Sequence, residues 1–264
     1  MAAVRIAVIG LGEAGRIFAQ GFAARGAAVS AFDVAPPTES LTGVELLPSI
    51  SAAVADAELV VSLVGASAAD AVAAEALGHL AGGAVLADFN TASPDAKAAC
   101  AARAAERGAL FADVAVLAPA HRAGAATPLI ASGSGAVRVA ELLGPLGSPI
   151  EVVGERAGDA AGLKLLRSIF MKGLAGIVLE SLAAASRTGA EEWMRGQIEA
   201  ELGPAAAPLV ERLVTGTRRH ARRREHEMRD VLAYLAELGT PSWMTAGAIE
   251  WLHATDRAGE ASDR

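Results

Sequence analysis

The sequence predicts an α/β domain over residues 1–157 and an all-α C-terminal domain over residues 158–264, joined by one long helix. Three observations predict this fold. Short apolar runs alternate with helical stretches up to about residue 153, which is typical of a parallel sheet covered by helices. A long apolar stretch of helical period then begins at Gly158. After Ser186 no pattern of strand type returns.

The strands expected in the first domain are short and apolar, as strands buried on both faces should be. They are residues 4–9, 28–32, 44–47, 59–64, 84–87, 110–116, 128–131 and 149–153. Helices are expected between them. Ser93-Pro94 supplies an N-cap and a first-turn proline for a helix that runs to Arg107. The pair Ser67 and Asp70 has the spacing of a capping box, with Asp in place of the usual Glu, and marks another helix start.

The composition excludes several classes of partner. The formal net charge is −7 and aromatic residues make up 4% of the chain, so neither the electrostatics nor the stacking surfaces of a nucleic-acid or membrane-surface protein are expected. Cys100 is the single cysteine, which fits a reducing, cytoplasmic location and rules out an internal disulfide. No signal peptide and no metal-ligand cluster are recognised, so no metal is expected.

A glycine motif follows the first strand directly. Gly10, Gly12 and Gly15 form G-x-G-x-x-G between a strand and a helix, the setting in which this motif binds the pyrophosphate of a dinucleotide. The first domain is therefore predicted to be a Rossmann-type dinucleotide-binding domain. Asp33 ends the second strand, where a carboxylate binds both ribose hydroxyls and repels a 2′-phosphate, and no Arg follows it. This favours NAD over NADP as cofactor.

Further cofactor contacts are expected where parallel strands end, since ligands of such sheets bind at the carboxyl ends of the strands. The loops concerned are 10–15, 64–68, 88–93 and 117–124. Together with the three glycines and Asp33, the predicted cofactor-binding residues are Leu11, Glu13, Ala14, Val64, Gly65 and Asn90.

The long helix carries two cations near its start. Lys164, Arg167 and Ser168 share one face at steps of three and four residues. The cations are explained either by snorkelling, with apolar stems packed and charged heads in water, or by a lysine that faces a cleft and takes part in chemistry. Lys172, two turns further on, is interpreted as structural. Lys164, Arg167 and Lys172 also argue against a membrane-spanning helix, although the apolar run is long enough for one. A second long helix is expected over residues 208–238, with a possible break at residues 215–217.

These segments together resemble the β-hydroxyacid dehydrogenase family, which includes the 3-hydroxyisobutyrate and 6-phosphogluconate dehydrogenases. Residues 88–94 (DFNTASP) resemble the family's D-x-S-T-x-x-P segment, with Asn90 in place of Ser. Residues 158–168 resemble its catalytic G-x-G-x-x-x-K-x-x-x-N segment, and this match identifies Lys164 with the catalytic lysine. The resemblance implies that Asn90 and Thr91 contact the substrate.

Two departures from the family pattern affect the expected substrate. Ser168 replaces an Asn that helps to hold the substrate, and Leu117-Ala118 stand where the family has a substrate-binding Ser and a flexible Gly. Arg167 or the arginines of residues 219–224 would then bind an anionic group instead. Residues 220–228, which include Arg223 and Glu227, look like a little-characterised subgroup of phosphogluconate-dehydrogenase-like proteins; the resemblance implies only that this region contributes to the cleft and to dimers.

The sequence therefore predicts an NAD-dependent oxidoreductase that transfers a hydride between the cofactor and a small, anionic hydroxy or keto substrate, with Lys164 as general acid and base. One alternative is an imine reductase of related architecture, against which Lys164 argues, because such enzymes typically have no lysine at that place. Another is an NAD-binding sensor or scaffold without catalytic activity. The Ala-rich C-terminal half and the glycines of the long helix predict a homodimer or a higher homo-oligomer.

Overall fold

The computed structural model describes residues 3–262. Contacts between residues divide the chain into two compact units, residues 1–164 and 165–264, which we call the α/β unit and the helical unit. The expected domain boundary was seven residues earlier, after Ala157. The difference arises because the start of the long helix is hydrogen-bonded to the sheet, as described below.

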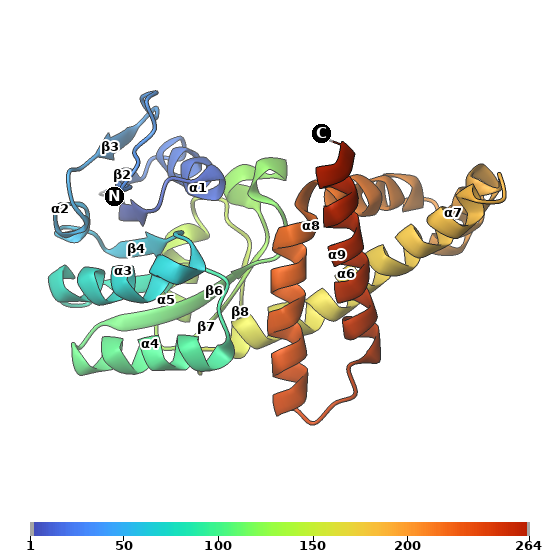
Figure 1. Ribbon diagram of the computed structural model, residues 1–264. Helices are drawn as coiled ribbons and strands as arrows, with labels where there is room; N and C mark the ends of the chain where they lie inside the picture. Colours follow the sequence, from blue (N-terminus) through green and yellow to red (C-terminus); the bar gives the residue numbers. More distant parts are fainter. Residues whose placement is uncertain (1–2, 263–264) are drawn as a thin grey trace. The chain divides into compact units, whose positions relative to one another are not determined.

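The α/β unit is built on one eight-stranded sheet (Figure 1). Its strands are β1 (Arg5–Ile9), β2 (Ala28–Phe32), β3 (Val44–Leu46), β4 (Leu59–Ser62), β5 (Val85–Asp88), β6 (Leu110–Val116), β7 (Leu129–Ser132) and β8 (Ile150–Gly154). Their order in the sheet is β3-β2-β1-β4-β5-β6-β7-β8. Every pair is parallel except β6 with β7. All eight predicted strands are present, and the first six have the order of a doubly wound dinucleotide-binding sheet.

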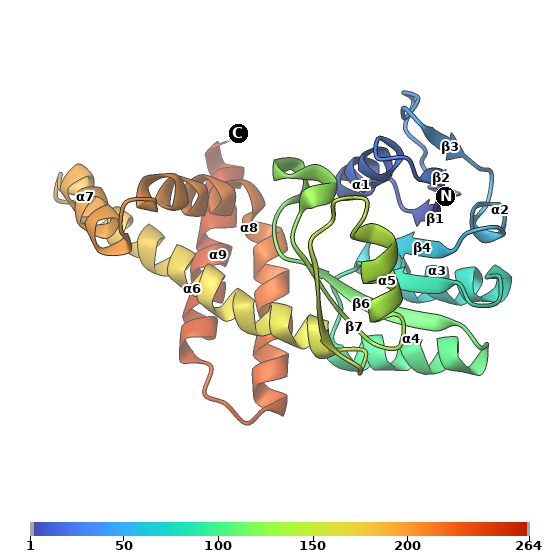
Figure 2. The ribbon, with the colours of Figure 1, turned by 180° about the vertical axis from the view of Figure 1, so that it is seen from behind.

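Helices cover both faces of this sheet. They are α1 (Glu13–Ala23), α2 (Ile50–Val54), α3 (Ala66–His79), α4 (Pro94–Glu106) and α5 (Ala136–Leu143), with short 3-10 turns at Ala120–Arg122 and Gly124–Ala126. One apolar core lies under α1 and α5 and a second under α2, α3 and α4. Figure 1 shows α3 and α4 in front of the sheet, and Figure 2 shows α5 on the opposite face.

The two predicted helix starts have different outcomes. Ser93 caps α4 and accepts a hydrogen bond from the Ala96 N–H, as predicted. The expected capping box at Ser67 and Asp70 is wrong, because α3 already begins at Ala66. Its N-cap is Gly65, which has no side chain with which to cap, so Ser67 lies within the first turn.

The helical unit contains most of α6 (Asp159–Ser186), together with α7 (Glu191–Leu202), α8 (Ala206–Glu237) and α9 (Trp243–Ser262). Helices α8 and α9 lie side by side (Figure 1), and Met228 and Val231 of α8 share a core with Leu252 of α9. A Cβ on Gly176 of α6 would lie 3.8 Å from the Cα of Ala248, an ordinary van der Waals contact, so the packing of α6 against α9 does not require a glycine there.

Helix α8 is interrupted, but not where the sequence predicted. The backbone leaves helical geometry at His220 (φ −129°, ψ 26°), and Figure 2 shows the helix changing direction. Residues 215–217 stay helical, so the predicted break there is wrong. The hydroxyls of Thr215 and Thr217 donate to the carbonyls of Glu211 and Leu213, four residues earlier, and so are satisfied inside the helix despite Gly216.

One face of α6 is exposed and apolar. Leu163, Leu166, Phe170 and Ile177 recur at steps of three, four and seven residues and are each 41–68% exposed. By length and composition alone, α6 would be able to cross a membrane, and 39% of the tested window is buried. We call these four residues the α6 seam.

Candidate active site

The glycine loop has the geometry that its motif predicts. Gly10 has a φ of +95°, and a Cβ on it would lie 2.4 Å from the carbonyl oxygen of Leu63, so only glycine fits there. A Cβ on Gly15 would lie 1.9 Å from the carbonyl oxygen of Gly10. Gly15 therefore allows α1 to pack on the loop itself, rather than chiefly on a strand.

Gly12 differs from the other two glycines because the space beside it is open. It is the N-cap of α1, no side chain caps that helix, and a Cβ on Gly12 would have no atom within 4 Å. The first turn of α1 thus offers backbone N–H groups and the positive end of a helix dipole next to open space. This arrangement fits the pyrophosphate of a nicotinamide dinucleotide.

Asp33 joins the end of β2 to the glycine loop. Its Oδ2 accepts a hydrogen bond of 2.5 Å from the Leu11 N–H, and its Oδ1 accepts one of 2.8 Å from the Ala35 N–H. The carboxylate is therefore held at the place where the ribose of a bound dinucleotide is expected.

The other predicted cofactor residues lie along the same edge of the sheet. Val64 follows β4, and its Cγ1 would be 2.9 Å from a Cβ on Gly10. Gly65 is the N-cap of α3, while Glu13 and Ala14 lie in the first turn of α1. Apart from Asn90, the cofactor residues predicted from the sequence thus gather at the ends of β1, β2 and β4.

A row of buried polar side chains crosses the neighbouring strands. Ser62, Asp88 and Asp113 are register partners on β4, β5 and β6, and Asp113 pairs in turn with Ser132 on β7. Each of the four is at most 6% exposed. We call Ser62, Asp88, Asp113 and Ser132 the polar row. Buried carboxylates require partners, because a lone charge in a protein core is strongly destabilising.

Lys97 of α4 supplies the countercharge and is itself only 1% exposed. Its Nζ lies 3.0 Å from Asp88 Oδ2 and 3.3 Å from Asp113 Oδ1, and it donates a 2.8 Å hydrogen bond to the carbonyl of Asp88. One ammonium thus bridges two carboxylates on adjacent strands.

Asn90 is fixed by one end of the polar row. Its backbone N–H and its Nδ2 donate to Asp88 Oδ1 at 2.9 and 2.6 Å, and Nδ2 also donates to Ser62 Oγ at 2.9 Å. Its Oδ1 is buried and has no hydrogen-bond partner within residues 3–262. An acceptor in this state fits a donor on a bound ligand, such as the carboxamide of a nicotinamide.

The start of α6 is fixed by the other end of the polar row. Asp113 Oδ2 accepts hydrogen bonds from the Gly158 N–H at 3.2 Å and the Ala161 N–H at 2.8 Å. Ser132 Oγ accepts one from the Ala160 N–H at 3.0 Å. The carboxylate of Asp113 therefore sits at the positive end of the α6 dipole.

Lys164 lies one turn beyond these capped residues. Its Nζ donates a 2.9 Å hydrogen bond to Thr91 Oγ1, in the loop after β5. The structure therefore brings Lys164, Thr91 and Asn90, which the family resemblance implied as site residues, into one region of the α/β unit. An amine next to a hydroxyl, close to the edge that carries the glycine loop, is able to move a proton to or from a bound substrate.

Leu117 and Ala118 follow the end of β6. Leu117 packs with Ala115, Ile130 and Ala160, and its N–H donates to the carbonyl of Pro128. Its side chain is thus part of an apolar cluster that supports the start of α6. A polar substrate anchor is missing at this position, as the sequence indicated.

Three of the predicted substrate residues meet within the helical unit. Glu227 Oε1 lies 3.7 Å from Arg223 Nε, and Glu227 Oε2 lies 2.9 Å from Lys172 Nζ, which also donates to Ser168 Oγ at 2.8 Å. We call Ser168, Lys172, Arg223 and Glu227 the cationic cluster. Arg167 is exposed and lies outside it. In the same helix, burial lowers the pKa of the Arg224 guanidinium, which donates to Thr217 Oγ1.

Sequence reasoning missed Lys97, Ser62 and Ser132. Lys97 had a usable signal, because it shares the buried face of α4 with Cys100 and Ala104 at steps of three and four residues. Burial on that face also raises the pKa of the Cys100 thiol. A lysine on the apolar side of a helix requires buried carboxylates, which Asp88 and Asp113 supply in the structure.

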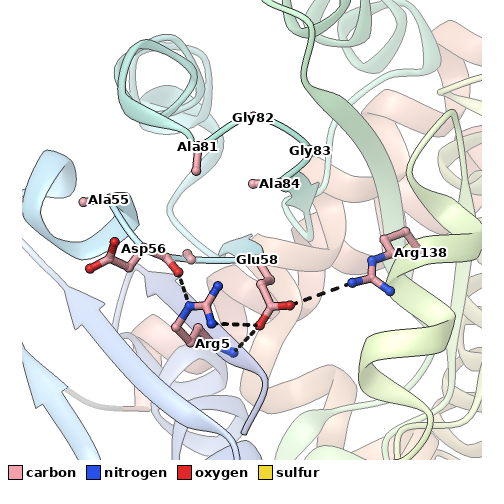
Figure 3. A pocket seen from close by; sticks show the side chains of 10 residues that line it. Arg5, Ala55, Asp56, Glu58, Ala81, Gly82, Gly83, Ala84 and Arg138 are labelled. Carbon is pink, nitrogen blue, oxygen red and sulfur yellow. Dashed lines mark hydrogen bonds and ion pairs between the residues drawn. The ribbon is translucent and has the colours of Figure 1, made fainter. Parts of the chain in front are cut away.

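A cavity of about 400 Å³ lies near the amino ends of β1, β4 and β5, at the edge of the sheet away from the glycine loop (Figure 3). Three of its charged groups are paired with one another: Glu58 lies 3.7 Å from Arg5 and 3.8 Å from Arg138. None of the predicted site residues lines it.

The glycine loop, Asp33 and the strand order define the α/β unit as a nicotinamide-dinucleotide-binding domain of the oxidoreductase type. Residues 5–154 match the model of the NAD binding domain of 6-phosphogluconate dehydrogenase, and residues 185–255 match a domain of unknown function. The chain therefore belongs to the β-hydroxyacid dehydrogenase-like family.

Individual relatives extend this result. An uncharacterised 28.5 kDa protein of Methanothermus fervidus is 34% identical over 107 residues, which span 40% of this chain and 42% of that protein. The structure of a conserved hypothetical protein from Sinorhizobium meliloti is 32% identical with a TM-score of 0.77, and the match covers 96% of this chain and 88% of that one. The 3-hydroxyisobutyrate dehydrogenase of Mycobacterium tuberculosis, solved with L-serine, shares the fold at 20% identity and a TM-score of 0.81, covering 96% and 93%.

Imine reductases share the fold as well. The enzyme from Myxococcus stipitatus is 20% identical in its NADP⁺ complex, with a TM-score of 0.67. A variant of it in complex with NAD⁺ is 21% identical, with a TM-score of 0.69, and both matches cover 97% of this chain and 95% of that one. The fold thus accommodates either nicotinamide cofactor.

Proposed function

We propose that this protein is an NAD-dependent dehydrogenase or reductase that acts on a small, anionic hydroxy or keto substrate, with Lys164 as general acid and base. The observation that carries the proposal is the hydrogen bond from Lys164 Nζ to Thr91 Oγ1, in the unit that also holds the glycine loop. A lysine with only a surface role would extend into water instead of binding a hydroxyl beside a buried polar row.

The bound nicotinamide would supply or accept the hydride. In the direction of reduction, the Lys164 ammonium donates a proton to the carbonyl oxygen of the substrate. In the direction of oxidation, neutral Lys164 removes the proton of the substrate hydroxyl. Thr91 keeps the amine in place before the substrate arrives, and Asn90 presents its unpartnered Oδ1 to a ligand donor.

We further propose that the cationic cluster binds an anion in the helical unit, so that Lys172, interpreted from the sequence as structural, also takes part in binding. Two cations, Lys172 and Arg223, flank the single carboxylate of Glu227, so the cluster keeps a net positive charge. Leu117 of the α/β unit, by contrast, offers no polar atom of its side chain to a carboxylate or phosphate.

Lys164→Ala should lower kcat by roughly 100- to 10,000-fold, the usual contribution of a general acid or base, and leave NADH affinity nearly unchanged. Lys164→Arg should not restore activity, because a guanidinium does not release a proton near neutral pH. Arg187→Ala, an exposed cation just after α6, is the matched control. The measurement is a screen of hydroxy acids, keto acids and their phosphorylated forms for NADH formation or consumption. Near-normal turnover by Lys164→Ala would refute the assignment.

The preference for NAD rests on Asp33. NADH should bind more tightly than NADPH by about 1–2 kcal/mol, comparable to a charged hydrogen bond. Because Asp33 also holds the Leu11 and Ala35 N–H groups, Asp33→Ala would loosen the loop as well as remove the charge. Asp33→Asn keeps an acceptor oxygen. It should reduce the difference between the binding free energies of NADH and NADPH, and it should lose less NADH affinity than Asp33→Ala. Equal or tighter binding of NADPH by the wild type contradicts the proposal.

The shared fold supports an imine reductase as the second candidate. The same screen separates the two, since an imine reductase consumes reduced cofactor with cyclic imines and leaves hydroxy acids unchanged. A chain that binds NADH and turns over neither class would instead be a sensor or scaffold.

A further inference from the structure

We propose that Lys97 is a positioning residue for the proton-transfer pair: it holds Lys164 and Thr91 at hydrogen-bond distance through two chains of contacts that both begin at its ammonium group. This rests on the proposed role of Lys164. Lys97 itself contacts neither substrate nor cofactor in the proposal, and it acts through Asp88 and Asp113.

The first chain of contacts leads to Thr91. Lys97 Nζ binds the carboxylate and the carbonyl of Asp88. Asp88 Oδ1 in turn accepts hydrogen bonds from both the backbone and the side chain of Asn90. Thr91 is the next residue, so the direction in which the loop leaves β5 is set by the ion pair of Lys97 with Asp88.

The second chain of contacts leads to Lys164. Lys97 Nζ lies 3.3 Å from Asp113 Oδ1, which leaves Asp113 Oδ2 to accept the Gly158 and Ala161 N–H groups at the start of α6. Lys164 follows Ala161 by three residues, so its Cα lies about one turn further along the helix. The placement of Asp113 therefore fixes both the depth and the rotation of the turn that carries Lys164.

The charge arrangement distinguishes this role from simple packing. Lys97 contributes one positive charge between two carboxylates that are 6% and 1% exposed. The remaining negative charge is met by backbone N–H groups of Asn90, Gly158 and Ala161, which are the groups that place Thr91 and Lys164. A buried ion pair adds little net stability compared with an apolar replacement of similar shape. Its role here is the geometry that it imposes at the Lys164–Thr91 pair.

The test uses the fact that the chain has only three lysines, Lys97, Lys164 and Lys172. Side-chain NMR of protein with labelled lysine follows the titration of Lys164 without any substrate, and Lys164→Arg assigns its signal. Lys97→Met should move the titration midpoint of Lys164 by about half a pH unit or more, because the distance to Thr91 and the exposure to water change. With an active substrate, kcat should fall about 10- to 100-fold while KM and NADH affinity change much less.

Lys97→Met leaves two buried carboxylates without their cation, so a second variant, Asp113→Asn, keeps the proposal testable if Lys97→Met does not fold. Asp113→Asn keeps one acceptor oxygen for the start of α6 and leaves Lys97 paired with Asp88. It should also move the Lys164 titration, by a smaller amount.

Two controls separate positioning from general loosening. Arg103→Met removes a cation from the same helix α4, where Arg103 pairs with Asp70, and should leave Lys164 unchanged. Leu143→Ala removes a fully buried side chain from α5 and lowers stability without touching the polar row. A Lys164 titration that stays at its wild-type midpoint in both Lys97→Met and Asp113→Asn overturns the proposal. So does an equal shift in Leu143→Ala. If the Lys164 signal shifts as expected but no substrate is turned over, the positioning stands and the proposed activity fails.

Discussion

The glycine loop allows cofactor binding and folding to be disrupted separately at two positions only three residues apart. Gly12 is an N-cap with φ −60° and ψ −170°, a conformation open to any L-residue, and its Cβ would meet nothing within 4 Å. Gly15 is inside α1, and its Cβ would lie 1.9 Å from a backbone carbonyl. The substitutions Gly12→Ala and Gly15→Ala add the same methyl group. We expect the first to lower NADH affinity and the second to lower stability.

For Gly12→Ala, we expect a change in stability close to zero. Replacing Gly by Ala restricts the unfolded chain and stabilises by about 0.4–1 kcal/mol, while Ala is a poorer N-cap than Gly by about 0.5 kcal/mol. NADH affinity should fall tenfold or more, because the methyl group keeps the pyrophosphate from at least one backbone N–H, and a hydrogen bond to a charged group contributes about 1.5–3 kcal/mol.

For Gly15→Ala, overlap with the carbonyl of Gly10 dominates. Overpacking costs about 1–3 kcal/mol, and the better helix propensity of Ala returns up to about 1 kcal/mol. A net loss of about 1–2 kcal/mol lowers the Tm of a chain of this size by about 2–8 °C. Thermal unfolding without cofactor and NADH titration by fluorescence measure the two effects. If Gly12→Ala binds NADH as tightly as the wild type, the open space beside Gly12 is not the pyrophosphate site.

Two further predictions concern the helical half of the chain. We predict a homodimer that buries the α6 seam, so light scattering should give about twice the chain mass for the wild type and the monomer mass for Phe170→Asp. Sedimentation with vesicles should show no binding of the seam to a bilayer. A wild type that stays monomeric at all concentrations would refute the prediction. The hydrogen bond from Arg229 holds the pKa of Glu225 below its usual value, so the stability that Glu225 contributes is complete above the unfolded pKa of about 4.3 and is lost as pH falls through the folded pKa. The Tm of wild type should therefore differ most from that of Glu225→Gln near neutral pH, and this difference should fall to near zero at low pH. A Tm difference that is independent of pH would contradict the pKa shift.

The sequence predicted most of the fold because its signals are local. Apolar runs bounded by glycine located all eight strands, and the motif at residues 10–15 located the cofactor edge. The break in α8 was misplaced, because glycine propensity favoured Gly216 while the threonine hydroxyls on either side keep that turn helical. Propensity alone does not reveal that the backbone departs from helix at His220 instead.

The candidate site was predicted unevenly for a physical reason. Lys164 and Thr91 lie 73 residues apart, and only the resemblance to a family placed them together. The polar row joins residues from four strands in register, and strand register depends on the whole sheet rather than on any short segment. The position of Lys97 on the buried face of α4 could be recognised from the sequence, but its partners could not, since they are defined by β5 and β6 being neighbours.

The boundary between the two compact units falls directly after Lys164. Lys164, the proposed proton donor, thus belongs to the cofactor-binding unit, although the helix that carries it continues for 22 residues into the helical unit. Changes in the helical half, and with them changes in substrate preference, would then leave the Lys164–Thr91 pair in place. The same position suits the construction of chimaeras. A chimaera joined after residue 164 should keep the hydrogen bond from Lys164 to Thr91 and acquire the substrate selectivity of the protein that supplies the helical half.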